Sequence, residues 1–408
     1  MTLRSVEVGE GLDTRELLAH ASRQAEDRGY SNFTIVDVDS HHYETESWAE
    51  IAKYIESPII RHLAGAGGVS KLTGQSSLIP SQIGNQDLAG RISRYRMRSL
   101  EKAEGKDVHR DVQLIRRAMS MMGIDYTIIF PTPMLNLGMH PQVEMEVAVA
   151  RAYARWITEE ILPADPTIKT MLYLPFNDPE ASLKLVEEFA DRPGVVGFMV
   201  TTVRYRPVHH NSYMKIYAAL EERGLPLGFH AAYSWQERAM EQLNKFISVH
   251  ALGFPFYNMI HLTNWVINGL PERFPALKVV WIESGLAWIP FLMQRLDNEY
   301  MMRSSEAPLL QKRPSEYMRD FYYSSQPMEQ TGNMEVLKMT FEMIDAENRL
   351  LYSSDYPHWD FDLPSVIYDL PFLDERVKRR ILGGNACELF GLEDAKTRGP
   401  AGENRERV

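Results

Sequence analysis

The sequence of 408 residues is poor in cysteine, in long apolar runs and in positive charge. Its single cysteine, Cys387, excludes an intramolecular disulfide and favours a reducing compartment, so we expect a cytoplasmic protein. No stretch approaches the roughly 18 apolar residues of a membrane span, and residues 1–15 lack the apolar core of a signal peptide. Lys and Arg number 44 against 55 Asp and Glu, which argues against general binding to nucleic acid or anionic membranes.

Short β-rich runs alternate with segments of helical length from residue 34 onward. The runs are rich in Val, Ile, Phe and Tyr, as is typical of parallel strands covered on both faces. We predict strands at residues 34–39, 125–130, 169–174, 195–200, 225–229, 277–282, 321–324 and 350–354. Helical patterns occupy residues 142–162, 179–191, 212–223, 257–270, 286–303, 328–345 and 374–390. Eight such units predict an α/β fold, a (β/α)8 TIM barrel, with a doubly wound sheet as the alternative.

Three segments lie outside this alternation. Residues 1–33 begin polar and then become helical, so we interpret them as an N-terminal helical extension packed on a larger body. Residues 43–122 form a long insertion after the first strand, with loop-like parts that we expect to act as a lid. The barrel would then span residues 34–392, followed by a disordered tail over residues 393–408.

Acidic and histidine side chains follow four of the eight predicted strands. Asp39 and His41 are two residues apart on the first strand and therefore share one face. His230, Glu283 and Asp355 end the fifth, sixth and eighth strands. Functional side chains of a barrel come from these carboxyl ends, and imidazole with carboxylate suits Zn²⁺, Mn²⁺ or Fe²⁺. The pattern predicts a metal site, although each residue alone would more often be a cap or a hydrogen-bonded structural group.

At these residues the sequence resembles the amidohydrolase superfamily, in the amidohydrolase 2 branch that includes the aminocarboxymuconate-semialdehyde decarboxylase-like enzymes. The resemblance covers residues 34–392. Its motifs are Asp39-x-His41-x-x-Glu44, Pro226-x-x-x-His230, the run 268–278 leading into Glu283-Ser284-Gly285, Ser354-Asp355-Tyr356-Pro357-His358, and Gly384-Asn385-Ala386. The resemblance implies a distorted (β/α)8 barrel with an ion held by Asp39, His41, His230 and Asp355.

The chain departs from that family pattern at two strand ends. Asp39 stands where the superfamily commonly has a histidine, and Glu283 stands where many decarboxylases place a proton-carrying histidine. Further candidate ligands or acid/base groups are Glu44, His261, Glu283 and His358. This excess predicts one or two ions of zinc, iron or manganese per chain. Open alternatives are a loop-anchoring role for Glu44, a core position for His261, and for His358 the orientation of a ligand or of the substrate.

A metal-dependent hydrolase is the function we predict from this set. Water bound to the metal would attack an amide, ester, thioester, lactone or activated C–C bond, with Glu283, Asp355 and His358 as catalytic groups. The alternative is a nonoxidative decarboxylase or hydratase that acts on an aromatic or unsaturated acid at the same site. An alternative of another class is a barrel that has lost catalysis and only binds a ligand.

The substrate is expected to be a small carboxylate or acyl compound with an apolar part. Arg204 and Arg206 follow the fourth strand and could clamp a carboxylate or phosphate, although surface arginines are commoner. Trp235 and Trp359 lie in the loops after the fifth and eighth strands and could line an apolar pocket. A homodimer is expected only because symmetric assembly is common.

Overall fold

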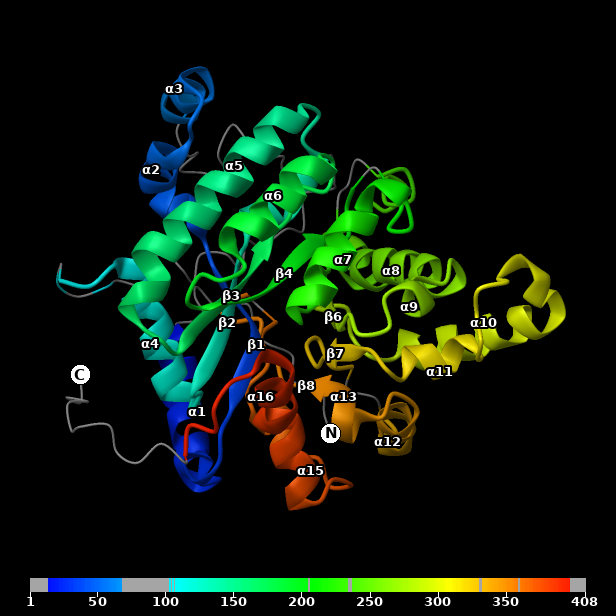
Figure 1. Ribbon diagram of the computed structural model, residues 1–408. Helices are drawn as coiled ribbons and strands as arrows, with labels where there is room; N and C mark the ends of the chain where they lie inside the picture. Colours follow the sequence, from blue (N-terminus) through cyan, green and yellow to red (C-terminus); the bar gives the residue numbers. More distant parts are fainter. Residues whose placement is uncertain are drawn as a thin grey trace.

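The computed structural model describes residues 14–67, 103, 105, 107–204, 206–233, 237–329, 332–358 and 360–396. Eight parallel strands pair in the order of the sequence, from β1 to β8 (Figure 1). They are β1 Val36–His42, β2 Tyr126–Pro131, β3 Ile168–Tyr173, β4 Val195–Thr201, β5 Leu227–His230, β6 Val279–Ile282, β7 Tyr322–Ser324 and β8 Leu350–Leu351. All eight predicted strands are confirmed, and the (β/α)8 barrel with them.

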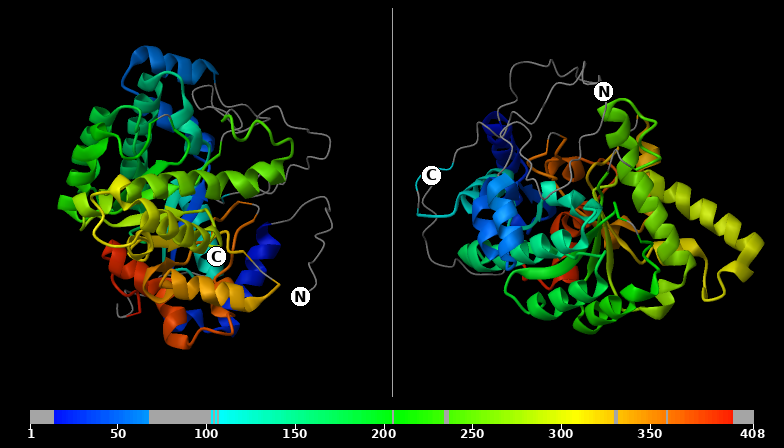
Figure 2. Two further views of the ribbon diagram at one scale, coloured as in Figure 1. Left: turned by 90° about the vertical axis from the view of Figure 1, so that its right-hand side faces the viewer. Right: turned by 90° about the horizontal axis from the view of Figure 1, so that it is seen from above.

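Helices follow the strands and cover the outside of the barrel (Figure 2). They are α1 Thr14–Asp27, α2 Trp48–Ile51, α3 Pro58–Gly67, α4 Arg110–Met122, α5 Val143–Trp156, α6 Pro179–Phe189, α7 Met214–Arg223, α8 Phe246–Ile267, α9 Leu270–Arg273, α10 Trp288–Arg303, α11 Pro314–Met318, α12 Met334–Met343, α13 Ala346–Arg349, α14 Ser365–Tyr368, α15 Glu375–Arg379 and α16 Asn385–Phe390. Gly123 and Gly224 end α4 and α7 in the left-handed conformation, which glycine adopts without steric cost. Helix α8 begins at Phe246 and contains Pro255, whereas the sequence pattern predicted a start at residue 257.

Side chains take the place of ladder hydrogen bonds at the end of β8. The predicted strand extends to residue 354, but the observed strand stops at Leu351. Beyond it, the Ser353 amide donates to Ser325 Oγ and the Ser354 amide donates to the Asp37 carboxylate. The chain still runs beside β1, because the Val38 amide donates to the Tyr352 carbonyl at 3.0 Å. Polar side chains therefore help to close the barrel where its metal-site candidates lie.

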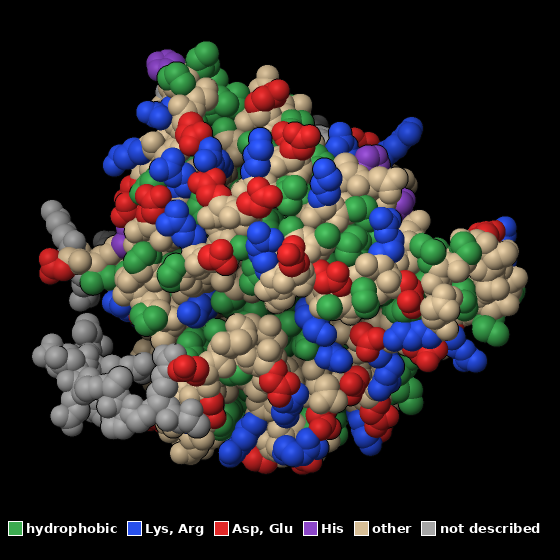
Figure 3. All heavy atoms as spheres, in the orientation of Figure 1, with side chains coloured by type: hydrophobic (Ala, Val, Ile, Leu, Met, Phe, Trp, Pro, Cys, Tyr) green, Lys and Arg blue, Asp and Glu red, His purple; other side chains and the backbone are tan. Residues whose placement is uncertain are grey.

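The N-terminal helix α1 packs against α4, with Leu18 and Ala21 buried. The insertion after β1 contributes α2, α3 and α4, while residues 68–102 lie outside the described part, as do residues 397–408 of the tail. The lid and the disordered tail therefore stay predictions. In the face that Figure 3 shows, basic and acidic side chains are interspersed. Among the described helices, none combines the length and the apolar character that crossing a membrane requires.

Candidate metal centre

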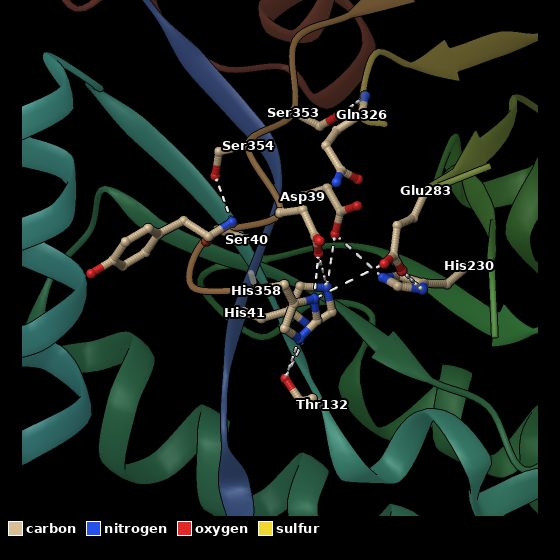
Figure 4. Close-up of polar contacts among 12 residues, drawn as sticks. Asp39, Ser40, His41, Thr132, His230, Glu283, Gln326, Ser353, Ser354 and His358 are labelled. Carbon is tan, nitrogen blue, oxygen red and sulfur yellow. Dashed lines mark hydrogen bonds and ion pairs between the residues drawn. The ribbon is translucent and has the colours of Figure 1, made fainter. Parts of the chain in front are cut away.

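Six of the predicted site residues converge at the carboxyl end of the barrel. Figure 4 shows five of them close together, namely Asp39, His41, His230, Glu283 and His358. Within the described part of the chain, two groups of side chains could each hold a metal ion, with ligand atoms within 4.8 Å of one another. The two groups share one residue, His41 on β1. The first group is Asp39, His41, His230 and Glu283, and the second is His41, Asp355 and His358.

The ligand atoms of the two groups face one another at short range. His41 Nε2 lies 3.3 Å from Asp39 Oδ1 and 3.2 Å from Asp355 Oδ1. His230 Nε2 also lies 3.3 Å from Asp39 Oδ1. Four buried atoms of the cluster have no hydrogen-bond partner, namely Asp39 Oδ2, His41 Nε2, Glu283 Oε2 and Asp355 Oδ2. Because buried polar atoms are almost always satisfied, and because this donor set is the one that divalent ions take, the residues fit a divalent metal cofactor.

Neighbouring groups turn the two histidine rings toward the cluster. His230 Nδ1 donates to the Ala231 carbonyl at 2.9 Å, which leaves Nε2 as the nitrogen that faces Asp39. His41 Nδ1 lies 3.3 Å from Thr132 Oγ1, so its Nε2 faces the two aspartates. This is how metal-binding imidazoles are usually held, with the second nitrogen fixed by a polar neighbour.

The pKa shifts of the buried carboxyl groups indicate a site that a cation would stabilise. Burial raises the pKa of Glu283 well above its usual value, and the charges of Asp39 and Asp360 add to this. Burial, followed by the charge of Glu283, likewise raises the pKa of Asp355. For Asp39, burial opposes ionisation, yet His230 and His41 outweigh it and hold the pKa of that carboxyl below its usual range. Several carboxylates confined together repel one another unless a positive ion balances them.

Two of the carboxylates stand on strained backbone. Glu283 and Asp355 have φ values of 57° and 59°, in the left-handed region that non-glycine residues rarely occupy. Such a conformation costs on the order of 1–3 kcal/mol and persists only where surrounding contacts impose it. The Glu283 amide donates to Ser324 Oγ at 2.9 Å, and the Asp355 amide donates to the Asp39 carbonyl at 2.7 Å. The surrounding contacts therefore hold both residues in a strained backbone conformation, and this conformation directs their side chains into the barrel mouth.

His358, a member of the second group, has a contact at each of its ring nitrogens. Its Nδ1 is 2.7 Å from Asp355 Oδ1 and 4.0 Å from Glu283 Oε1. Its Nε2 is 3.2 Å from Thr132 Oγ1, the hydroxyl that also contacts His41. Thr132 thus links two histidines of the site.

Glu44 and His261, predicted as further ligands, belong to neither group. The Glu44 carboxylate accepts hydrogen bonds from the Thr132 amide at 3.0 Å and the Met134 amide at 2.8 Å. It therefore anchors the loop after β2, the alternative that the sequence left open. His261 Nε2 donates to the Thr202 carbonyl at 2.6 Å from within α8. Burial, reinforced by the charge of Arg204, lowers the pKa of His261, as expected for a core histidine.

The predicted substrate residues fall in different places. The guanidinium carbon of Arg204 lies 5.3 Å and 5.6 Å from the ring centres of Phe176 and Phe229, in the layer where Phe229 stacks on Trp281. Arg206 is exposed at the surface. Trp235 and Trp359 lie outside the described residues, so their predicted role is unchanged.

Sequence reasoning missed Thr132, Asp37 and Ser354. Thr132 directly follows β2, so a search of every strand end for hydroxyls as well as for ionisable groups would have found it. Asp37 and Ser354 flank the predicted ligands Asp39 and Asp355, but their mutual contact joins positions 317 residues apart. No local pattern signals such a contact.

The fold and this site define a parallel eight-stranded barrel with a candidate metal centre at its carboxyl end. The chain belongs to the amidohydrolase family, whose Amidohydro_2 model, described as Amidohydrolase, matches residues 39–392. This confirms the family resemblance of the sequence motifs.

Several proteins that this chain is similar to are named as decarboxylases. The chain is 22% identical to 2-amino-3-carboxymuconate-6-semialdehyde decarboxylase of Dictyostelium discoideum, over 55% of this chain and 61% of that enzyme, which is less than two thirds of it. It is 20% identical to gamma-resorcylate decarboxylase of Polaromonas sp., over 60% of this chain and 76% of that enzyme. A solved structure of dihydroxybenzoic acid decarboxylase from Polaromonas sp. JS666, with manganese and the inhibitor 2-nitroresorcinol, has a TM-score of 0.60 at 17% identity, covering 88% of this chain and 97% of that one.

The prediction of a hydrolase is therefore wrong. It rested on the whole set of candidate ligands, and the glutamate in place of the strand-six histidine of many decarboxylases favoured hydrolysis only modestly. A buried carboxyl can also carry a proton, so this exchange does not separate the two reactions. The relatives support the alternative, nonoxidative decarboxylation.

Proposed function

We propose that the protein is a nonoxidative decarboxylase of a small aromatic carboxylic acid, with a divalent metal held by Asp39, His41, His230 and Asp355. The observation that carries the proposal is this buried cluster, with its unpaired ligand atoms, in a member of a family whose matching relatives are decarboxylases. The manganese and the aromatic inhibitor in the related structure support both the metal class and the substrate class.

When bound, a divalent ion supplies positive charge that can orient an acidic substrate and stabilise negative charge on its oxygens. The chain's own residues supply orientation and proton transfer. Asp39 Oδ1 and Asp355 Oδ1 lie 3.3 Å and 3.2 Å from His41 Nε2, so both carboxylates would face an ion held at that nitrogen. Burial of Asp39, His41, His230, Glu283 and Asp355 excludes water from the reacting groups.

Glu283 is the residue we assign to proton transfer. Its carboxyl lies 3.4 Å from His230 Nδ1 and 4.0 Å from His358 Nδ1. The carboxyl would deliver its proton to the ring carbon that bears the carboxylate. The bond between that carbon and the carboxylate then breaks, its electron pair restores the aromatic ring, and carbon dioxide leaves. His358, hydrogen-bonded to Asp355, is assigned to positioning that ligand.

The proposal is tested with protein loaded with Mn²⁺ and a panel of benzoic acids that carry a hydroxyl next to the carboxylate. We expect carbon dioxide release, with one deuterium on the ring carbon when the reaction runs in D2O. Asp355→Asn should lose bound manganese and carbon dioxide release together. Full manganese loading of the wild type without any decarboxylation across the panel would contradict the proposed reaction.

Finer features of the protein remain part of this proposal. Zinc or iron could replace manganese, since both take the same ligands. The two groups of possible ligands share His41, so the site is consistent with one or two ions. The single cysteine favours the cytoplasm, and a homodimer is the commonest symmetric assembly. Metal analysis per chain and light scattering test the ion number and the assembly.

A further inference from the structure

Two segments that carry residues of the candidate metal site meet at the junction of β1 and β8. Beyond Leu351 this junction has few regular ladder bonds, because β8 is only two residues long. The Asp355 amide donates to the Asp39 carbonyl at 2.7 Å, and the His41 amide donates to the Tyr356 carbonyl at 2.7 Å. The relative positions of Asp39 and Asp355 therefore depend on a few contacts of this junction.

The Asp37 carboxylate bridges the two segments at this point. Its Oδ1 accepts from the Ser354 amide at 2.8 Å and from the Asp39 amide at 3.2 Å. Its Oδ2 accepts from the Ser354 hydroxyl at 2.5 Å. The same hydroxyl accepts from the Tyr356 amide at 3.0 Å, on the other side of Asp355. The backbone on both sides of Asp355 is thus fixed through one buried carboxylate.

These contacts explain how Asp355 keeps its left-handed backbone. The Ser354 amide binds a side-chain carboxylate instead of a strand carbonyl, so Asp37 holds the backbone directly before the left-handed Asp355. Asp37 itself belongs to neither ligand group among the described residues, and its oxygens face amides and a hydroxyl. Its position suits the orientation of ligands, not the direct binding of the ion.

We propose that Asp37 is a positioning residue that sets the spacing between Asp39 and Asp355 and thereby the affinity of the site for a divalent cation. This inference rests on the proposed function, since it takes these two aspartates as metal ligands. Groups that orient metal ligands typically change metal affinity by roughly 10–100-fold when they are removed. Asp37→Asn replaces one carboxylate oxygen by an NH2 group, which cannot accept the hydrogen bond from the Ser354 hydroxyl. The size of the side chain stays the same.

The experiment measures Mn²⁺ affinity of the full chain by calorimetry, together with the thermal stability of the metal-free protein. Asp37→Asn should weaken Mn²⁺ binding by roughly 10–100-fold. Ser354→Ala removes only the hydroxyl contacts and should weaken it less, by roughly tenfold. Ser40→Ala is the matched control, because Ser40 lies on the same strand but bonds to Thr127 Oγ1 at 2.6 Å, and its Mn²⁺ affinity should equal that of the wild type.

The outcomes separate this inference from the proposed function. A wild type that binds no Mn²⁺ would refute the metal site, whatever the variants do. A wild type that binds Mn²⁺, with unchanged affinity in Ser354→Ala and in Asp37→Asn, would overturn the positioning role. Lower stability of the metal-free variants with unchanged affinity of the folded protein would make Asp37 a purely structural residue. If Asp37→Asn does not fold, the affinity of Ser354→Ala decides the question.

Discussion

His41 and His42 are neighbours on β1, yet their side chains have opposite environments. His41 Nε2 lies among carboxylate oxygens of the cluster and has no hydrogen-bond partner. His42 points to the helix layer, where Nδ1 lies 3.3 Å from Asp111 Oδ2 on α4 and Nε2 lies 2.7 Å from Tyr153 OH on α5. Its ring also stacks on Trp156 at 5.7 Å. Both rings are buried, so burial does not distinguish them.

The two histidines differ in whether their ring nitrogens have hydrogen-bond partners. A buried histidine with a partner for each nitrogen is complete without a ligand and contributes to the fold. A buried histidine whose nitrogen faces several carboxylates but bonds to none needs a cation to complete its surroundings. Alternation along the strand assigns these two roles to adjacent positions, because successive side chains point to opposite faces. Substitutions at each position should therefore have separable effects.

The largest effect is expected from His41→Asn. The variant loses a nitrogen that both ligand groups share, so Mn²⁺ binding and decarboxylation should fall below detection. The metal-free protein should lose less stability than it does in His42→Asn, since His41 Nε2 makes no hydrogen bond that the substitution would break. Calorimetric Mn²⁺ titration and carbon dioxide release measure the two activities. Retained binding would show that the shared position of His41 is not essential.

Glu283→Gln should lower the rate of decarboxylation without lowering metal binding. The amide keeps the size of the carboxyl but cannot donate an acidic proton, so we expect turnover to fall by roughly 10²–10⁴-fold. Manganese content should stay at the wild-type level if Asp39, His41, His230 and Asp355 hold the ion. Loss of metal in parallel with activity would instead assign Glu283 to the ligands. Elemental analysis of the purified variant distinguishes the two results.

His42→Asn should give the opposite pattern from His41→Asn. The variant breaks the buried contacts with Asp111 and Tyr153 and leaves that carboxylate without one partner, at a cost of about 2–4 kcal/mol in the free energy of unfolding. Affinity of the folded protein for Mn²⁺ should be retained. Tyr153→Phe is the matched control, since it removes a single hydrogen bond and should cost about 1 kcal/mol. Urea unfolding of the metal-free proteins measures both.

The contrast between the two histidines also marks how far the sequence alone reaches. Strand positions and the two-residue spacing of Asp39 and His41 follow from local alternation, so the barrel and the convergence of strand ends could be predicted. Glu44 sits three residues beyond that pair and could not be classified, because its partners are the amides of Thr132 and Met134 in another loop.

Longer-range partners escape local patterns in the same way. His261 is distinguished from a ligand by its contact with the Thr202 carbonyl and by its place outside both ligand groups of the described residues, which only the folded chain shows. The reaction could not be predicted either, because a metal with buried carboxylates serves both hydrolysis and decarboxylation. The local sequence identifies which residues reach the barrel mouth, and tertiary contacts decide which of them remain unsatisfied there.

The smallest effect is expected for the pH dependence of stability at Asp111, the carboxylate that contacts His42. Although burial opposes ionisation of Asp111, its hydrogen bond to His42 and the charges of His42, His109 and Arg110 lower the pKa of that carboxyl to about 2. Because the pKa is depressed in the folded state, the resulting stability is present above the unfolded pKa of about 3.9 and is lost as pH falls toward 2. It amounts to about 2 kcal/mol in full.

Asp111→Asn tests this linkage without a change in the metal site. The metal-free wild type should lose stability more steeply than the variant between pH 5 and pH 3, by about 1 kcal/mol over that range. Urea unfolding at several pH values in the presence of a chelator measures the two slopes. Equal slopes would mean that His42 does not hold a charged Asp111. His42 would then stabilise the fold only through ring packing on Trp156 and its hydrogen bond to Tyr153. The difference between His42 and His41 would be smaller than the hydrogen-bond geometry indicates.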